Sequence, residues 1–341
     1  MAKLNKTYNI LIRFAILVFT FYFLYEQLFY KHDLSSFIKN IEAVTQSKNF
    51  GILSIIVVLL LPVNLLLESF KWQYLMQKLE RVTMTGAFKA ILTGISVSIF
   101  LPNRVGDYLG RVFILKKADR LQATLATILG SMAQLLTTIL FGLTAVAFFL
   151  PHWISPDSSL NRWAFVGLLF SIFVVSVVMV FAFLNFRVFS VLLKSISGRA
   201  YKKIARYAEV FSWYSVKELF YVLLISIFRY LVFSLQFFLL LRIFQIHIGY
   251  LHAMMVIGFI YLLMSIIPTI ALSEIGVRGS VSLYAFGLFF GTTTTLPEGL
   301  SRSIVAASSA LWLINLALPA LSGLFFTFKL RFFRNNKNYE H

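Results

Sequence analysis

Apolar segments long enough to cross a lipid bilayer recur along the whole chain, and they constrain its fold more than any other feature. A helix needs about 20 apolar residues to cross about 30 Å of hydrocarbon. Six segments reach this length, at residues 9–29, 51–69, 121–150, 162–186, 218–241 and 302–328. A helix satisfies its own backbone hydrogen bonds in lipid, so these six segments predict an all-α integral membrane protein with six transmembrane helices.

The composition supports this class and narrows the chemistry. The chain is 59% hydrophobic and only 13% charged, whereas a soluble domain is about half apolar and a quarter charged. The net charge of +18 lies mostly in short loops, where topology and attraction to anionic lipid headgroups explain it. We therefore expect no nucleic-acid partner. The absence of cysteine excludes disulfides, thiolate metal sites and cysteine nucleophiles.

Two further apolar segments are broken by prolines. Residues 90–101 are too few to cross a bilayer, and Pro102 follows them directly. Residues 252–267 are followed by Pro268 and a polar stretch. Such segments predict re-entrant helical hairpins, which enter the membrane and return to the same side. We expect these hairpins near residues 90–116 and 252–290.

Loop charges predict the orientation of the chain. With the N-terminus inside, the cytoplasmic loops are residues 1–8, 70–90, 104–120, 187–217 and 329–341. They hold 22 of the 31 lysines and arginines, and the opposite loops hold only 6. This bias predicts a multi-pass protein of the cell (inner) membrane with both termini in the cytoplasm.

The flanks of the two hairpins differ in charge. Lys89 and the Lys116–Arg120 segment place the first hairpin on the cytoplasmic side, whereas no basic residue flanks the second closely. The hairpins should therefore enter from opposite sides, which makes the chain an inverted-topology repeat, a common transporter architecture. The predicted units are a first half at 1–150, a second half at 151–330 and a basic tail at 331–341.

The two hairpins share a charged pattern. Asp107 and Arg111 are four residues apart, and Glu274 and Arg278 repeat that spacing 167 residues further on. On a helix each pair lies on one face and can form a salt bridge. Each pair can either contact a substrate or clamp its hairpin to neighbouring helices, and both interpretations stay open.

A break in a helix inside a membrane must face a protein-lined cavity and not lipid, because an unpaired peptide group in lipid costs several kcal/mol. The free N–H groups of a helix that starts at a break favour an anion such as phosphate. The predicted structural breaks are Pro102, Gly106, Gly110, Pro268 and Gly276. The predicted substrate-binding residues are Asn103, Arg104, Asp107, Arg111, Arg229, Glu274 and Arg278.

Polar residues inside the spans need partners. Arg229 lies mid-span, and we expect Asp107 or Glu274 to neutralise it. Glu68 lies near a span end, where snorkelling to the interface and helix capping are expected. Gln134 and Asn315 are expected to form interhelical hydrogen bonds. The scattered histidines and the lack of nucleophile motifs predict no metal site, no catalytic residue and no cofactor.

Residues Phe100–Arg111 resemble the first signature of the lysylphosphatidylglycerol synthase transmembrane-region (flippase-like) family, usually Leu-Pro-x-Arg-x-Gly-Glu. Residues Ser273–Arg278 resemble its second, Gly-Gly-x-Gly-x-Arg-Glu. Asp107 stands for the usual glutamate, Ser273 and Glu274 replace the glycine pair, and Gly279 replaces the final acidic residue. The resemblance implies movement of a lipid between leaflets, without the aminoacyltransferase domain of full-length synthases.

These observations predict a lipid translocase rather than an enzyme. Its partners would be membrane lipids with anionic headgroups: a phospholipid, an aminoacylated or glycosylated lipid, or a polyprenyl-phosphate-linked lipid. The first alternative is a membrane-embedded glycosyltransferase with a polyprenyl-phosphate donor, whose acidic residues would come from Asp33, Glu42, Asp157 and Glu298. The second is a non-transporting scaffold for a lipid-modifying enzyme.

Overall fold

The computed structural model describes residues 50–99, 105–154, 159–186, 209–269, 271–291 and 296–327. Within these ranges all regular secondary structure is helical. The first predicted span, at residues 9–29, lies outside the described residues, as do Pro102, Asn103 and Arg104.

Five long helices match predicted spans in position, length and apolar composition. They are α3 (Phe50–Met76), α6 (Arg120–Trp153), α7 (Ser159–Leu184), α10 (Val216–Ile243) and a continuous C-terminal helix. That last helix consists of α13 (Glu298–Trp312), a π-helical segment η5 (Leu313–Ala317) and α14 (Leu318–Thr327). The prediction of a multi-pass helical membrane protein is confirmed for this part of the chain.

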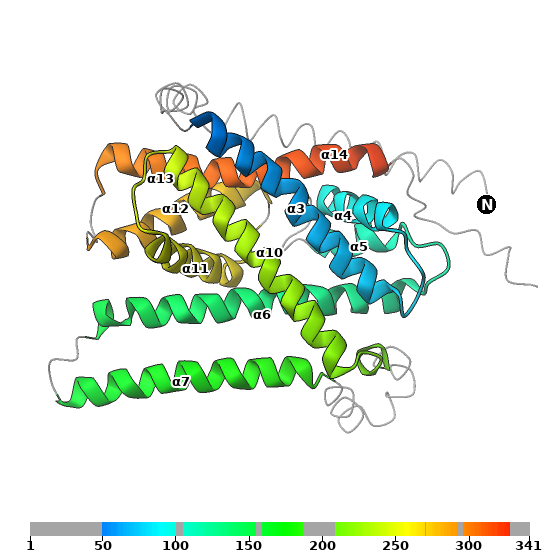
Figure 1. Ribbon diagram of the computed structural model, residues 1–341, viewed down its shortest axis with the longest axis horizontal. Helices are drawn as coiled ribbons and strands as arrows, with labels where there is room; N and C mark the ends of the chain where they lie inside the picture. The colour runs from blue at the N-terminus through cyan, green and yellow to red at the C-terminus, as the bar shows by residue number, and fades with distance from the viewer. Residues whose placement is uncertain are drawn as a thin grey trace, which may run out of the picture.

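Two pairs of shorter helices occupy the regions where hairpins were predicted. The first pair is α4 (Met84–Ser98) and α5 (Val105–Val112), and the second is α11 (Tyr250–Ile266) and α12 (Ala271–Phe290). The pairs lie at opposite ends of the bundle, α4 and α5 at the right of Figure 1 and α11 and α12 at the left. Each pair follows one long helix and precedes another, so both halves have the same order of elements.

Helices α3 and α10 lie side by side through the centre of the bundle and run in opposite directions (Figure 1). The hydrophobic core has two main parts, one around α4 and α5 and the other around α11 and α12. Helix α7 lies at the edge, and most of its apolar side chains, such as Phe173 and Phe181, face outward. This exposure suits a helix that borders lipid.

The start of α10 is fixed by local hydrogen bonds. Ser215 and Glu218 form a capping box, in which each side chain accepts a hydrogen bond from the backbone N–H of the other residue. Just before it, the Tyr214 hydroxyl donates to the carbonyl oxygen of Leu75 at 2.8 Å, which joins α10 to the end of α3. Burial and the nearby Glu218 carboxylate raise the pKa of Tyr214, so the hydroxyl keeps its proton.

The predicted breaks divide into two groups. Pro268 lies in the non-helical stretch between α11 and α12, where Ile267 is extended. Gly106, Gly110 and Gly276 instead lie inside helices α5 and α12, so the structure corrects their prediction as break positions. The glycines of α5 have a packing role. A Cβ atom on Gly110 would lie 2.7 Å from the Cα atom of Gly94 in α4.

Two glycines therefore offer a matched pair of substitutions. Gly110→Ala should destabilise the protein by about 1–3 kcal/mol, because the new methyl group forces α5 away from α4. Gly276→Ala makes the same change in α12 with no atom within 4 Å, and it should be neutral or stabilising by up to about 1 kcal/mol. Thermal unfolding of both variants in detergent measures the difference. Equal melting temperatures would contradict this account of the α4–α5 contact.

Candidate functional site

A cavity of about 610 Å³ lies inside the helical bundle. Both hairpin regions contribute to its wall, together with α3, α6, α10 and the C-terminal helix. Six charged residues line it: Glu68, Asp107, Arg111, Arg229, Glu274 and Arg278. The structure therefore places every described residue of the predicted substrate-binding set around one space.

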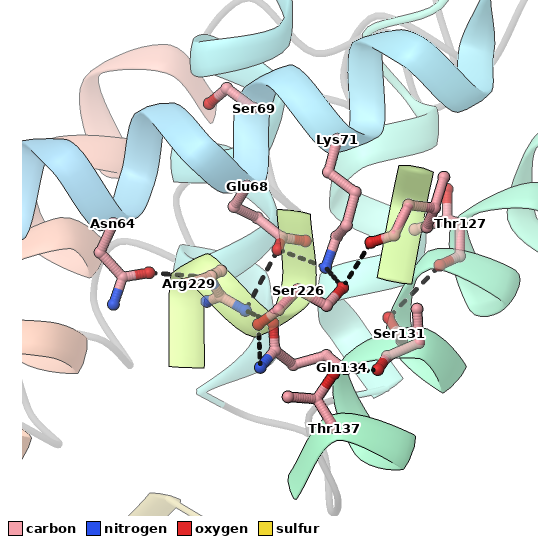
Figure 2. A network of polar contacts seen from close by, with 12 residues as sticks. Asn64, Glu68, Ser69, Lys71, Thr127, Ser131, Gln134, Thr137, Ser226 and Arg229 are labelled. Atoms are coloured by element: carbon pink, nitrogen blue, oxygen red, sulfur yellow. Dashed lines mark hydrogen bonds and ion pairs between the residues drawn. The ribbon is translucent and has the colours of Figure 1, made fainter. Parts of the chain in front are cut away.

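Glu68 is the centre of the charged network. Its Oε1 atom accepts a hydrogen bond from Nη1 of Arg111 at 2.6 Å. Its Oε2 atom lies 2.8 Å from Nζ of Lys71 and 3.1 Å from Nη1 of Arg229. Figure 2 shows Lys71 and Arg229 converging on this carboxylate. One buried carboxylate thus holds three cations from α3, α5 and α10, a charge-pairing arrangement that offsets the cost of removing each from water.

Glu68 and Lys71 were not among the predicted site residues, and the expectation of snorkelling is wrong. Their side chains are only 4% and 1% exposed. Helix α3 continues to Met76, so both residues lie inside the helix rather than at its end. The spacing of Asn64, Glu68 and Lys71 at i, i+4 and i+7 was a usable signal, because it places three polar side chains on one face of an apolar helix.

Arg111 has all three guanidinium nitrogens paired. Nε donates to Oδ1 of Asp107 at 2.7 Å, Nη2 pairs with Oδ2 of the same residue, and Nη1 pairs with Glu68. The predicted salt bridge between Asp107 and Arg111 therefore forms, and its arginine also joins α5 to α3. Full pairing favours the clamp interpretation for this pair.

Arg229 is paired differently from the prediction. Its carboxylate partner is Glu68, not Asp107 or Glu274. Nε also donates to Oδ1 of Asn64 at 2.7 Å, and Nη1 donates to Oε1 of Gln134 at 3.2 Å. The Arg229 side chain is 28% exposed, whereas the other two cations that pair with Glu68, Lys71 and Arg111, are at most 6% exposed. Arg229 is therefore the most accessible cation of the network.

Arg278 forms the second predicted salt bridge, with Nη2 2.7 Å from Oε1 of Glu274. The residue is only 7% exposed, and its Nε and Nη1 atoms are buried with no hydrogen-bond partner among the described residues. Buried donors in proteins are almost always paired, with protein, water or ligand. Arg278 lines the cavity and has two buried donors without a partner among the described residues, in contrast to the fully paired Arg111.

The amide side chains behave as predicted. The Gln134 side chain donates to the carbonyl oxygen of Ser226, and Asn315 Nδ2 donates to Oε1 of Gln236 at 2.7 Å. Both hydrogen bonds join different helices. Asn315 lies in the π-helical segment η5 and lines the cavity. Such segments are frequent at functional sites, because the extra residue per turn redirects a side chain.

Metal chemistry has no visible support in the described ranges. No group of three histidine, aspartate or glutamate side chains lies close enough there to hold an ion. The six charged groups of the cavity are instead arranged as cation–carboxylate pairs. This arrangement suits electrostatic recognition of a charged ligand.

A match to a known protein family shows what this chain is related to. A family model, the lysylphosphatidylglycerol synthase TM region, matches residues 10–323. This chain belongs to that family. The resemblance of the motifs around Arg111 and Arg278 is thereby confirmed for the chain as a whole. The lysylphosphatidylglycerol synthase TM region is the non-catalytic, flippase-like part of those synthases, so membership indicates a function related to membrane lipids.

Two further comparisons give no match. Neither a search of curated proteins nor a search of solved structures finds a similar protein for this member of the lysylphosphatidylglycerol synthase TM region family.

Proposed function

We propose that this protein moves an anionic lipid between the leaflets of the cell membrane. The observation that carries the proposal is the cavity, in which arginines from both halves of the chain meet inside a bundle of membrane-length helices. Its volume of about 610 Å³ falls within the usual range for small-molecule sites. A lipid headgroup would occupy the cavity while the acyl chains remain in the bilayer.

The arrangement of helices supports an alternating-access mechanism. The order α3, α4, α5, α6 is repeated as α10, α11, α12, α13, and the two short pairs lie at opposite ends of the bundle (Figure 1). We therefore propose two inverted halves with re-entrant hairpins and cytoplasmic termini, as the loop charges predict. Rocking of one half against the other would open the cavity to each leaflet in turn.

Phosphate is the chemical feature that the candidate lipids share. A phospholipid, an aminoacylated or glycosylated phospholipid and a polyprenyl-linked lipid all carry it. Arginine is the residue best suited to phosphate, because its planar fork donates several hydrogen bonds. Arg278 supplies two buried donors that have no partner among the described residues, and Arg229 supplies an accessible charge.

The glycosyltransferase alternative receives no comparable support. It needs acidic side chains gathered at the outer face, and of its four candidates only Glu298 is described. Glu298 is exposed and forms a salt bridge with Arg302. No described observation favours this alternative over lipid movement.

Leaflet exchange in proteoliposomes tests the proposed function. Vesicles containing the purified protein and acyl-labelled phosphatidylglycerol are treated with an impermeant quencher. We expect the inner-leaflet label to be quenched much faster than in protein-free vesicles, because the protein carries it outward. Phosphatidylcholine, a zwitterion, should exchange more slowly. Equal rates with and without protein would contradict the proposal, and co-purified lipids identified by native mass spectrometry would name the physiological substrate.

A further inference from the structure

Lys71 is a buried amine whose role the proposed lipid path does not explain. Its side chain is 1% exposed, and it lies within a helix of membrane-spanning length. The ammonium group contacts Oε2 of Glu68 at 2.8 Å and donates to Oγ of Ser226 at 3.4 Å (Figure 2). Its aliphatic stem runs beside Gly130 of α6. A lysine is rarely buried so fully in a membrane helix without a functional reason.

The cluster of charged groups around Lys71 contains more cations than carboxylates. The charged groups that face it are Glu68 on its own helix, Arg111 of α5 and Arg229 of α10, and Asp107 neutralises part of Arg111. On α6, the neutral Gln134 lies nearby and hydrogen-bonds Arg229. With Lys71 protonated, this cluster has three cations and two carboxylates, a net charge of +1. With Lys71 neutral, the net charge is zero.

Lysine is the cation of this cluster that can change its charge. A guanidinium keeps its proton in proteins, whereas a buried lysine can lose its proton. A net positive charge in a low-dielectric interior is costly, unless an anion is present to balance it. The protonation of Lys71 and the occupancy of the cavity by an anion must therefore depend on each other.

We propose that Lys71 is a proton-coupling site, which takes up one proton when a phosphate-bearing headgroup enters the cavity and releases it when the headgroup leaves. This inference rests on the proposed function. The headgroup would contact Arg229, the accessible cation that shares Glu68 with Lys71. By linkage, a protonated Lys71 tightens binding of the anion, and the bound anion favours the protonated lysine by the same factor.

The network also provides a route for the proton. Glu68 lines the cavity and lies 2.8 Å from Lys71, so it can accept the proton released from Nζ. The N–H bond of the ammonium breaks, an O–H bond forms at Oε2, and the carboxyl group then passes the proton to water in the cavity. Glu68 returns to its charged form and Lys71 is left as a neutral amine.

Binding of short-chain phosphatidylglycerol to the detergent-solubilised full chain, measured from about pH 6 to pH 10, tests the inference. Its phosphodiester stays singly charged throughout, so the titration reports on the protein. We expect the affinity to fall about tenfold or more as pH rises and Lys71 loses its proton, a typical linkage magnitude. Weakly buffered samples with an indicator dye should show proton uptake on lipid binding near the middle of this transition.

Two substitutions fix the charge of the site. Lys71→Met, a side chain of similar length, should bind weakly at every pH, and Lys71→Arg should bind tightly at every pH. Glu68 keeps Arg111 and Arg229 in the methionine variant, so folding should survive, and thermal unfolding checks this. Lys78→Met removes an exposed lysine that pairs with Glu218 and should retain the wild-type pH profile.

The outcomes separate the two proposals. If wild type binds and exchanges the lipid with no pH dependence, or if Lys71→Met keeps the wild-type dependence, Lys71 is not the coupling site although the translocase function stands. If wild type neither binds nor exchanges the lipid at any pH, both proposals are overturned. The inference holds if both Lys71 variants lose the dependence and the Lys78 variant does not.

Discussion

Glu68→Ala should lower the free energy of unfolding by about 3–5 kcal/mol, the largest stability effect we expect from a single substitution in this protein. Three cations contact this carboxylate, two of them at 2.6 Å and 2.8 Å. Without it, Arg111 and Arg229 repel one another in a buried site, and Lys71 loses the carboxylate that holds its proton. Among the described carboxylates, Asp107 still pairs with Arg111. The melting temperature in detergent, followed by circular dichroism, measures the loss.

The control is Glu298→Ala. Glu298 also forms a salt bridge with an arginine, but both side chains are more than half exposed, so its removal should cost no more than about 1 kcal/mol. Adding Lys71→Met to Glu68→Ala should recover part of the stability, because it replaces a buried amine that has lost its carboxylate partner with an apolar side chain. Similar melting temperatures for the Glu68 and Glu298 variants would show that the buried network is not the stabilising element.

Arg278→Ala should slow leaflet exchange of phosphatidylglycerol by about 100-fold while the protein remains folded. The two donors Nε and Nη1 can each form a charge-assisted hydrogen bond with a phosphate, and such bonds contribute about 1.5–3 kcal/mol apiece. Glu274 loses the Arg278 salt bridge but can take up a proton, which limits the cost to stability. The quencher assay in proteoliposomes gives the rate, and the melting temperature gives the stability.

Two variants sharpen this prediction. Arg302→Ala removes the arginine of a Glu-x-x-x-Arg pair with the same spacing at the exposed start of α13, and it should leave exchange unchanged. Arg111→Ala should behave differently from Arg278→Ala, because it leaves Asp107 and Glu68 without a cation that joins α5 to α3, and it should mainly destabilise the fold. If Arg278→Ala and Arg302→Ala exchange lipid at the same rate, Arg278 is not the phosphate contact.

Local patterns predicted the parts of the structure that local geometry decides. Five spans were found from apolar length alone, and both i, i+4 salt bridges form because residues at that spacing share a helical face. The order of long and short helices was also predicted, because Pro268 and the polar residues after it interrupt an apolar segment.

Partners that lie far apart in the chain could not be predicted from spacing. Arg229 and Glu68 are 161 residues apart, and three carboxylates were available to neutralise this arginine. Glu68 was misplaced because the apolar segment appeared to end near it, whereas α3 continues for two more turns. Gly110 was interpreted as a helix break, although glycine also allows two helices to pack closely. Its contact with Gly94 in α4, which sequence spacing does not reveal, shows that close packing is its role.

The central claim is that the headgroup of a lipid enters the cavity between the two hairpin regions. Photocrosslinking tests it most directly, with phosphatidylglycerol that carries a photoreactive group on its headgroup and protein reconstituted in vesicles. We predict that mass spectrometry will find the label on cavity-lining segments, such as residues 261–269 at the end of α11 and just after it, and that excess unlabelled phosphatidylglycerol will prevent it. Labelling confined to the outward face of α7, with none in the cavity, would contradict the account.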